Sequence, residues 1–136
     1  AASAYLKRAG VPMHPSDLSS HECVCYRRYP SAGKVWRFQR GAESVSVNVD
    51  GAFGSDNSEA VREVIVNGHG IGLVAAYLCH TQLRTGTLVR LLPDWETTPR
   101  TNIYVCHSST RHVSPKVKAF SNFLADYFRD ADWARL

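Results

Sequence analysis

At 136 residues the chain has the length of one ordinary domain, and its 44% hydrophobic content is enough for a core. No apolar run approaches the roughly 20 residues of a membrane span, and no charged-then-apolar leader opens the sequence, so we expect neither a membrane protein nor a secretory signal. The net charge is +4. The basic residues of segment 27–40 fall in one hairpin region, where side chains alternate between the two faces of the strands. A solvated sheet face is therefore favoured over a nucleic-acid surface.

Cysteine and histidine spacing shows no metal or redox motif. The six histidines form no HxxxH or HExxH pattern, and no CxxC pair occurs among the four cysteines, Cys23, Cys25, Cys79 and Cys106. The cysteines are interpreted as small buried hydrophobes in a reducing cytoplasm. The sequence predicts no metal site and no cofactor.

The first fifty residues predict two short helical pieces and then a set of strands. A helical turn ends at Gly10, and a second short helix begins near Pro15. The strands are predicted over 23–29, 35–40 and 44–49. The last strand has the clearest alternation, with three valines inward and serine or asparagine outward. Together these patterns predict an antiparallel meander with one face on a core.

The segment 51–92 organises the rest of the chain. A strand end and a polar loop, 54–59, lead into a helix. Asp56 is predicted to cap this helix, with Glu59 three residues later, and Gly68 or Gly70 to end it. Backbone N–H groups at such a helix start can receive an anion. Three further elements are predicted: a buried strand over 71–74, a helix over 75–85 and a strand over 88–92.

The carboxyl-terminal part predicts a strand over 102–107 and a long amphipathic helix. Ser114 and Pro115 form an N-cap and a first helical position. A broad apolar stripe from Val117 to Phe128 follows. A meander followed by strand–helix alternation implies an α/β domain. The last strand and helix nevertheless carry a strong apolar face with few partners left in so short a chain.

Four segments together resemble the carboxyl-terminal part of a LysR-type transcriptional regulator. In order they are AYLKRAGVPMHPSDLSSHECV, VWRFQRGAESVSVNVDGAF, SDNSEAVREVIVNGHGIGLV, and GTLVRLLPDW with IYVCHSSTRHVSPKVKAFSNFLADYF. Each motif is weak, but their order and spacing are specific. The chain departs from the family pattern at His69, where an aliphatic residue is common, and at Cys79-His80-Thr81.

The resemblance implies a periplasmic-binding-protein-like (type 2) effector domain of two lobes. Residues 1–93 would form the second lobe. Residues 94–136 would cross back and supply one strand and the last helix of the first lobe. The winged helix-turn-helix, the linker helix and the amino-terminal half of the first lobe are expected outside this chain. As a fragment, the chain is expected to hide the apolar face of its last helix by self-association.

The resemblance also implies a ligand site between the lobes. Ser55, Asp56 and Asn57 would border the cleft on the second lobe, with Ile71 near its floor. His107 and Ser108 would border it from the first lobe. From the residues alone, a cap with no ligand near it is as well supported as a ligand contact at Asp56, which is itself an anion.

The function expected from the resemblance is effector sensing and oligomerisation in a cytoplasmic regulator. A small molecule, often an organic anion in this family, would modulate DNA binding by the absent domain. The protein would act as a homodimer or tetramer, and the helix over 58–67 is the expected contact surface. The alternative is a fragment of an extracytoplasmic solute-binding protein. An enzyme is not expected, since no nucleophile–base pair or phosphate loop is evident.

Overall fold

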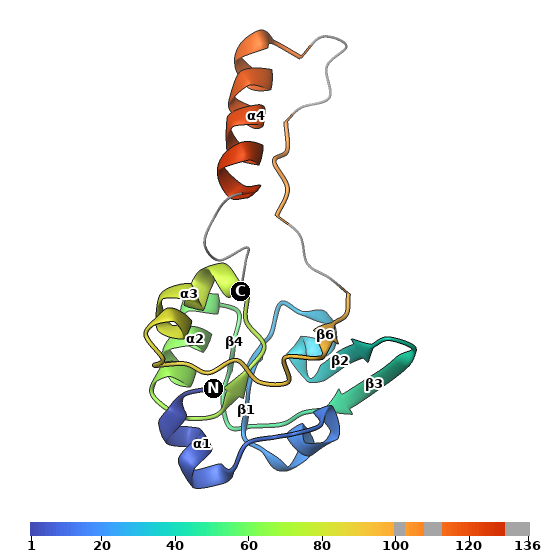
Figure 1. Ribbon diagram of the computed structural model, residues 1–136, viewed down its shortest axis with the longest axis vertical. Coiled ribbons are helices and arrows are strands. Elements are labelled where there is room, and N and C mark those ends of the chain that lie inside the picture. The colour runs from blue at the N-terminus through green and yellow to red at the C-terminus, as the bar shows by residue number, and fades with distance from the viewer. Residues whose placement is uncertain (100–102, 108–112, 130–136) are drawn as a thin grey trace. The chain divides into compact units, whose positions relative to one another are not determined.

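The computed structural model describes residues 1–99, 103–107 and 113–129 (Figure 1). Its contacts divide the chain into two units, residues 1–100 and 101–136, which are described separately. The elements of the first unit are α1 (Ser3–Ala9), η1 (Pro15–Ser20), β1 (Cys23–Tyr26), η2 (Pro30–Gly33), β2 (Val35–Arg40), β3 (Glu43–Asn48), β4 (Gly54–Ser55), α2 (Ser58–Val66), β5 (Ile71–Gly72), α3 (Ala76–Arg84) and β6 (Glu96–Thr97). The second contains α4 (Pro115–Arg129).

A parallel sheet of order β4-β1-β5 forms the centre of the first unit. Cys25 of β1 pairs with Gly54 of β4, and Cys23 pairs with Ile71 of β5, both in parallel. The first three residues of β1, Cys23, Val24 and Cys25, are buried in succession, with Cys23 and Val24 each 1% exposed. A strand covered on both faces does not alternate. The prediction that β1 opens an antiparallel meander was therefore wrong, because its pairing partners come from later in the chain.

A second, antiparallel sheet has the order β3-β2-β6. The predicted alternation of its hairpin is confirmed. Trp36, Phe38 and Val47 are buried, whereas Arg37 and Ser46, which pair across the hairpin, are exposed. The basic side chains of 27–40 are all exposed, as expected for a solvated face. They are Arg27, Arg28, Lys34, Arg37 and Arg40.

Two hydrophobic clusters lie on opposite faces of the parallel sheet. Cys23 and Cys25 face a cluster built with the hairpin, α1 and η1. Val24 faces the other cluster, to which α2 contributes Val61 and Ile65 and α3 contributes Cys79. Figure 1 shows α2 and α3 together on one side of β1 and β4, with the β2–β3 hairpin on the other. The first unit is thus three layers deep.

The first short helix ends, and the second begins, where the sequence predicts. Gly10 follows α1 with φ 87°, a conformation that glycine adopts without strain. The second helix, η1, is a 3₁₀ helix with a capping box. Ser16 N donates to His14 Nδ1 at 3.2 Å, and the Asp17 carboxylate accepts from His14 N at 2.9 Å. These bonds fix the chain just before β1.

The strand predicted over 88–92 is reduced to a single bridge. Leu88 pairs with Ala2 in antiparallel, and Val89 N donates to Ala1 O at 2.8 Å. Leu92 then takes φ 52°. This left-handed conformation breaks an extended strand, so the prediction was wrong beyond the bridge.

The second unit contains a confirmed helix and an unconfirmed strand. Helix α4 begins as predicted, since Lys118 N donates to Ser114 O at 3.1 Å. Asn102 of the predicted strand lies outside the described residues, and 103–107 are not assigned to a strand. A strand requires a neighbour for its backbone groups, and none pairs with 103–107 in the described part of the chain.

Candidate functional site

The candidate site lies at the carboxyl edge of the parallel sheet. In open α/β sheets, ligands bind outside the carboxyl ends of the strands. Here that edge is formed where β1 ends at Tyr26, where β4 ends at Ser55, and where β5 ends at Gly72. Tyr26 pairs with Ser55, and Arg27 N donates to Ser55 O at 2.8 Å, so the first two strand ends lie side by side.

A tight turn connects β4 to α2 at this edge. Ser55 Oγ accepts a hydrogen bond from Asn57 N at 3.1 Å. Asn57 Oδ1 in turn accepts from Glu59 N at 2.9 Å and from Ala60 N at 3.2 Å. The Ser55 hydroxyl is half-buried, whereas Asn57 is exposed. The turn therefore holds one hydroxyl and one side-chain amide in fixed positions beside the helix start.

The helix cap is Asn57, and the prediction of Asp56 as the cap was wrong. The helix starts at Ser58, and Asn57 precedes it with an extended backbone, φ −98° and ψ 113°. This backbone brings the Asn57 side chain to the second and third helical amides. Asp56 is exposed, and no hydrogen bond or ion pair of its carboxylate occurs within the described ranges. Its negative charge faces solvent at the same edge.

Three tyrosines gather at the same edge, a feature that sequence reasoning missed. The rings of Tyr26 and Tyr29 meet edge to face, with centroids 5.0 Å apart. Burial raises the pKa of the Tyr29 hydroxyl, and Tyr26 and Tyr77 raise it further. Tyr77 is the second residue of α3. The only sequence signal was that tyrosines occur at the end of β1, three residues after it and at the start of α3. They give the edge an aromatic wall beside the polar turn.

Of the other predicted site residues, only Ile71 belongs to the first unit, and it is not part of this turn. Ile71 is the first residue of β5 and is buried in the cluster on the hairpin side of the sheet. His107 belongs to the second unit, and Ser108 lies outside the described residues. The structure thus joins Ser55, Asp56 and Asn57 in one turn, and the roles of Ile71, His107 and Ser108 stay predictions.

The remaining chemical features concern metals, thiols and membranes. In the part of the chain that the structure describes, no three His, Cys, Asp or Glu side chains are grouped so as to hold a metal ion. Burial raises the pKa of the Cys23 thiol to about 12. Burial also raises the pKa values of the Cys25 and Cys79 thiols. Cys106 is exposed, contrary to the interpretation of all four cysteines as buried. Of the helices described, none has the length and apolar character of a membrane span.

Known proteins resemble this chain over nearly its whole length. The regulator PtxR of Pseudomonas aeruginosa, named as an HTH-type transcriptional regulator, is 32% identical over 121 residues, covering 88% of this chain and 38% of its own length. The HTH-type transcriptional activator TtdR of Escherichia coli is 30% identical over 125 residues, covering 92% and 40%. The chain thus spans about two fifths of the curated relatives that it matches.

Solved structures agree with these relatives. Full-length AphB of Vibrio cholerae, a member of the LTTR family, superposes with a TM-score of 0.74 at 28% identity, over 93% of this chain and 43% of that chain. The regulatory domain of AphB from Vibrio vulnificus gives 0.72 at 28%, over 93% and 62%. Regulatory domains of this kind have the periplasmic-binding-protein-like type 2 fold.

The family model of the LysR substrate binding domain matches residues 1–129. Its match covers all the described elements, including the carboxyl edge and α4. The predicted resemblance and fold class are confirmed, and the chain belongs to the LysR substrate binding domain family of transcriptional regulators.

Proposed function

We propose that this chain is the effector-sensing part of a LysR-type regulator and that its effector binds at the carboxyl edge of β1 and β4. The observation that carries the proposal is the β4–α2 turn, in which Ser55 and Asn57 are held by hydrogen bonds beside the start of α2. Polar groups held in fixed positions beside apolar side chains are the usual means of orienting a small ligand. The three tyrosines of that edge supply apolar surface.

An organic anion remains the class of effector that we propose. The amino end of α2 favours negative charge. Asn57 already occupies the amides of Glu59 and Ala60, so the anion would be bound by the Ser55 hydroxyl and the Asn57 side-chain amide. Asp56 opposes the anion unless its exposed carboxylate points away. The proposed site comprises Ser55, Asp56 and Asn57 at this edge, and the part that Ile71, His107 and Ser108 would take in it stays a prediction from the resemblance.

The lobe assignment is also a proposal. Residues 1–93 would form the second lobe, and 94–136 the crossover with the returning strand and last helix of the first. Phe120, Phe123 and Tyr127 of α4 are each more than 60% exposed, at 62%, 61% and 63%. The match to this chain covers 62% of the AphB regulatory domain, and the rest of that domain lies outside the match. We propose that the corresponding residues of the longer protein cover this face.

The whole regulator would then act on DNA through a helix-turn-helix domain outside this chain. We propose a homodimer or tetramer located in the cytoplasm, where the DNA is, without enzymatic activity. This is supported by the names of the matched relatives, which are transcriptional regulators. The helix α2 stays our candidate for the contact surface between copies.

The test replaces Ser55 by tryptophan in the full-length regulator. The large ring would fill the edge, so the transcriptional response of a reporter gene to its effector should be lost. Ser46→Trp is the matched control, because Ser46 is exposed on the hairpin. Both variants should keep the thermal midpoint of the parent within a few degrees. A Ser55→Trp regulator that responds like the parent would remove this turn from the site.

A further inference from the structure

A groove of about 620 Å³ lies at the opposite edge of the same sheet. Its walls come from α1, from the end of η1, from the residue before β1 and from the residues before β4. The side chains that line it include Tyr5, Arg8, His21, Glu22 and Asp50. A volume of several hundred Å³ is within the range of small-molecule sites.

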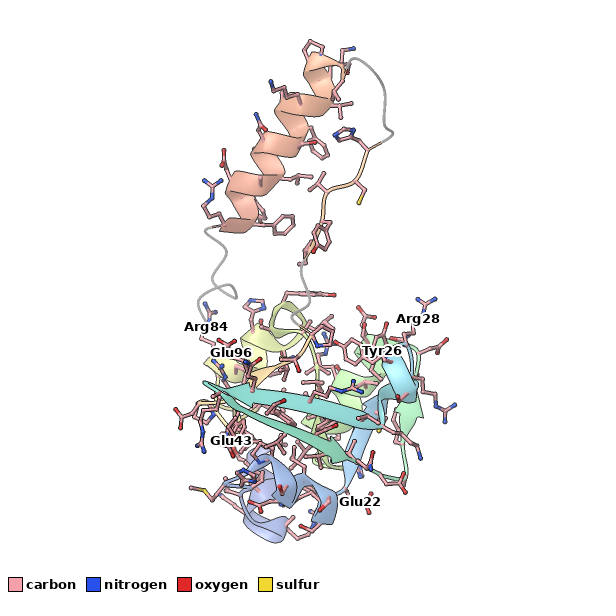
Figure 2. All side chains as sticks on the ribbon, turned by 90° about the vertical axis from the view of Figure 1, so that its right-hand side faces the viewer. Glu22, Tyr26, Arg28, Glu43, Arg84 and Glu96 are labelled. Carbon is pink, nitrogen blue, oxygen red and sulfur yellow. The ribbon has the colours of Figure 1, made fainter. Side chains whose placement is uncertain are left out.

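This groove is separate from the proposed effector edge. Glu22 directly precedes β1, whereas Tyr26 ends it. Figure 2 shows Glu22 at one end of the first unit and Tyr26 and Arg28 at the other. A ligand in the groove would contact the amino ends of the strands, and the carboxyl ends would stay free.

A buried hydroxyl organises the floor of the groove. Tyr5 is 3% exposed, and its hydroxyl oxygen accepts a hydrogen bond from Glu22 N at 3.0 Å. Because an N–H can only donate, the hydroxyl hydrogen is available to His21 Nδ1, 3.1 Å away. This arrangement suits the histidine tautomer that carries its hydrogen on Nε2. In that tautomer the imidazole can donate its Nε2–H to a ligand, and the contact with the Tyr5 hydroxyl orients the ring.

Two opposite charges line the groove without pairing with each other. Arg8 Nη2 donates to Gly68 O at 3.0 Å, and its guanidinium lies 5.5 Å from the Tyr5 ring centre. One Glu22 oxygen accepts from Ala52 N at 3.3 Å. Neither side chain forms an ion pair within 4.0 Å among residues 1–99, 103–107 and 113–129. Asp50, by contrast, is paired with Lys34 at 2.8 Å.

We propose that this groove binds a small zwitterion, a free α-amino acid. Its carboxylate would be received by the Arg8 guanidinium and by His21 Nε2, and its ammonium by the Glu22 carboxylate. Charge-assisted hydrogen bonds of this kind are stronger than neutral ones. The groove offers one unpaired cation and one unpaired anion, so a ligand with both charges satisfies it better than a simple acid or amine.

The experiment measures binding by titration calorimetry with the full-length regulator. The probes are L-alanine, L-leucine and L-glutamine at up to about 10 mM, which detects dissociation constants near 1 mM. Two analogues of leucine, 4-methylpentanoate and 3-methylbutylamine, each lack one of the two charges. We expect at least one amino acid to bind and both analogues to bind at least about tenfold more weakly.

Matched variants locate the binding. Glu22→Gln and Arg8→Gln should each weaken the amino acid about tenfold. The exposed residues Glu59 and Arg28 provide the charge-matched controls Glu59→Gln and Arg28→Gln, which should bind like the parent. Glu22 is exposed, so its variant is expected to fold even if loss of the Arg8–Gly68 bond destabilises the other.

Three outcomes would overturn the proposal: no binding of any of the three amino acids, equal binding of the amine analogue, or binding that survives Glu22→Gln. This inference does not depend on the proposed function. The Ser55→Trp variant should keep its amino-acid affinity even where it loses the effector response. A variant that loses both at once would place the amino acid at the effector edge instead of the groove.

Discussion

The central strand β1 and the helix α4 both carry several apolar side chains, but the surroundings of these side chains differ. In β1, Val24 is 1% exposed and packs against α2 and α3, while its neighbours pack against the hairpin. In α4, Phe123 is 61% exposed although it lies in a regular apolar stripe. An apolar pattern therefore predicts which face requires a partner, and it does not predict that the partner lies in the same chain.

The rate of cysteine alkylation should show the largest difference between the two units. At pH 8, a thiol with the pKa of Cys23, about 12, is ionised in about one part in ten thousand. Iodoacetamide should therefore label the exposed Cys106 within minutes and leave Cys23, Cys25 and Cys79 unlabelled while the chain is folded. Mass spectrometry of tryptic peptides measures the four rates. In guanidinium chloride all four should react, and comparable rates in the folded chain would contradict the burial of the first unit.

Truncation of one apolar side chain in each unit tests the same contrast energetically. Ile65 is 1% exposed and lies directly over Gly72, so Ile65→Ala leaves a cavity. It should lower the free energy of unfolding by about 3 kcal/mol. Phe123→Ala, at an exposed position, should change it by less than about 0.5 kcal/mol.

Urea unfolding of the 136-residue chain, at a protein concentration below that at which copies associate, is followed by circular dichroism and compares the two variants. A large loss for Phe123→Ala would mean that its ring is already covered in this chain, and the contrast between the units would fail.

Self-association of the isolated chain is the third test. The exposed rings of α4 should bring copies together when nothing else covers them. Phe120→Ser with Phe123→Ser should weaken this association at least about tenfold, since each buried aromatic ring contributes more than 1 kcal/mol. Sedimentation velocity across a range of concentrations measures the change, with Val11→Ser as a control on an exposed residue of the first unit. A parent chain that stays monomeric at high concentration would contradict the expectation.

The smallest effect separates the two candidates for the cap of α2. Asn57→Ala removes the acceptor of two helical amides and should cost about 1 kcal/mol. Asp56→Ala removes no hydrogen bond that we find in the described chain, and it should cost less than about half of that. Thermal unfolding of the two variants side by side measures the difference. Equal losses of stability in the two variants would mean that Asp56 also takes part in the cap.

The sequence predicted individual elements better than their pairing. Period-two alternation found the β2–β3 hairpin, and cap residues found the start of α4. The parallel pairing of β1 was missed because a strand buried on both faces leaves no alternation, and its partners β4 and β5 lie about 30 and 50 residues later. Nothing local in the sequence marks such a distant neighbour.

At the site, the polar turn was found and its internal arrangement was not. The run Ser55, Asp56, Asn57 offers two acidic or amide cap candidates in succession, and their spacing from the helix is the same within one residue. Only the extended backbone at Asn57 decides between them. The tyrosine wall was missed because Tyr77 is far from Tyr26 and Tyr29 along the chain.

The burial of β1 on both faces has a mechanical consequence. Its side chains interlock with one cluster on each side, and such cores are close-packed and deform little. A ligand that binds at the end of this strand therefore meets a core that does not deform to accommodate it. We therefore expect the first unit to move as a rigid body about its connections, so that ligand binding at one end of the sheet displaces the whole unit.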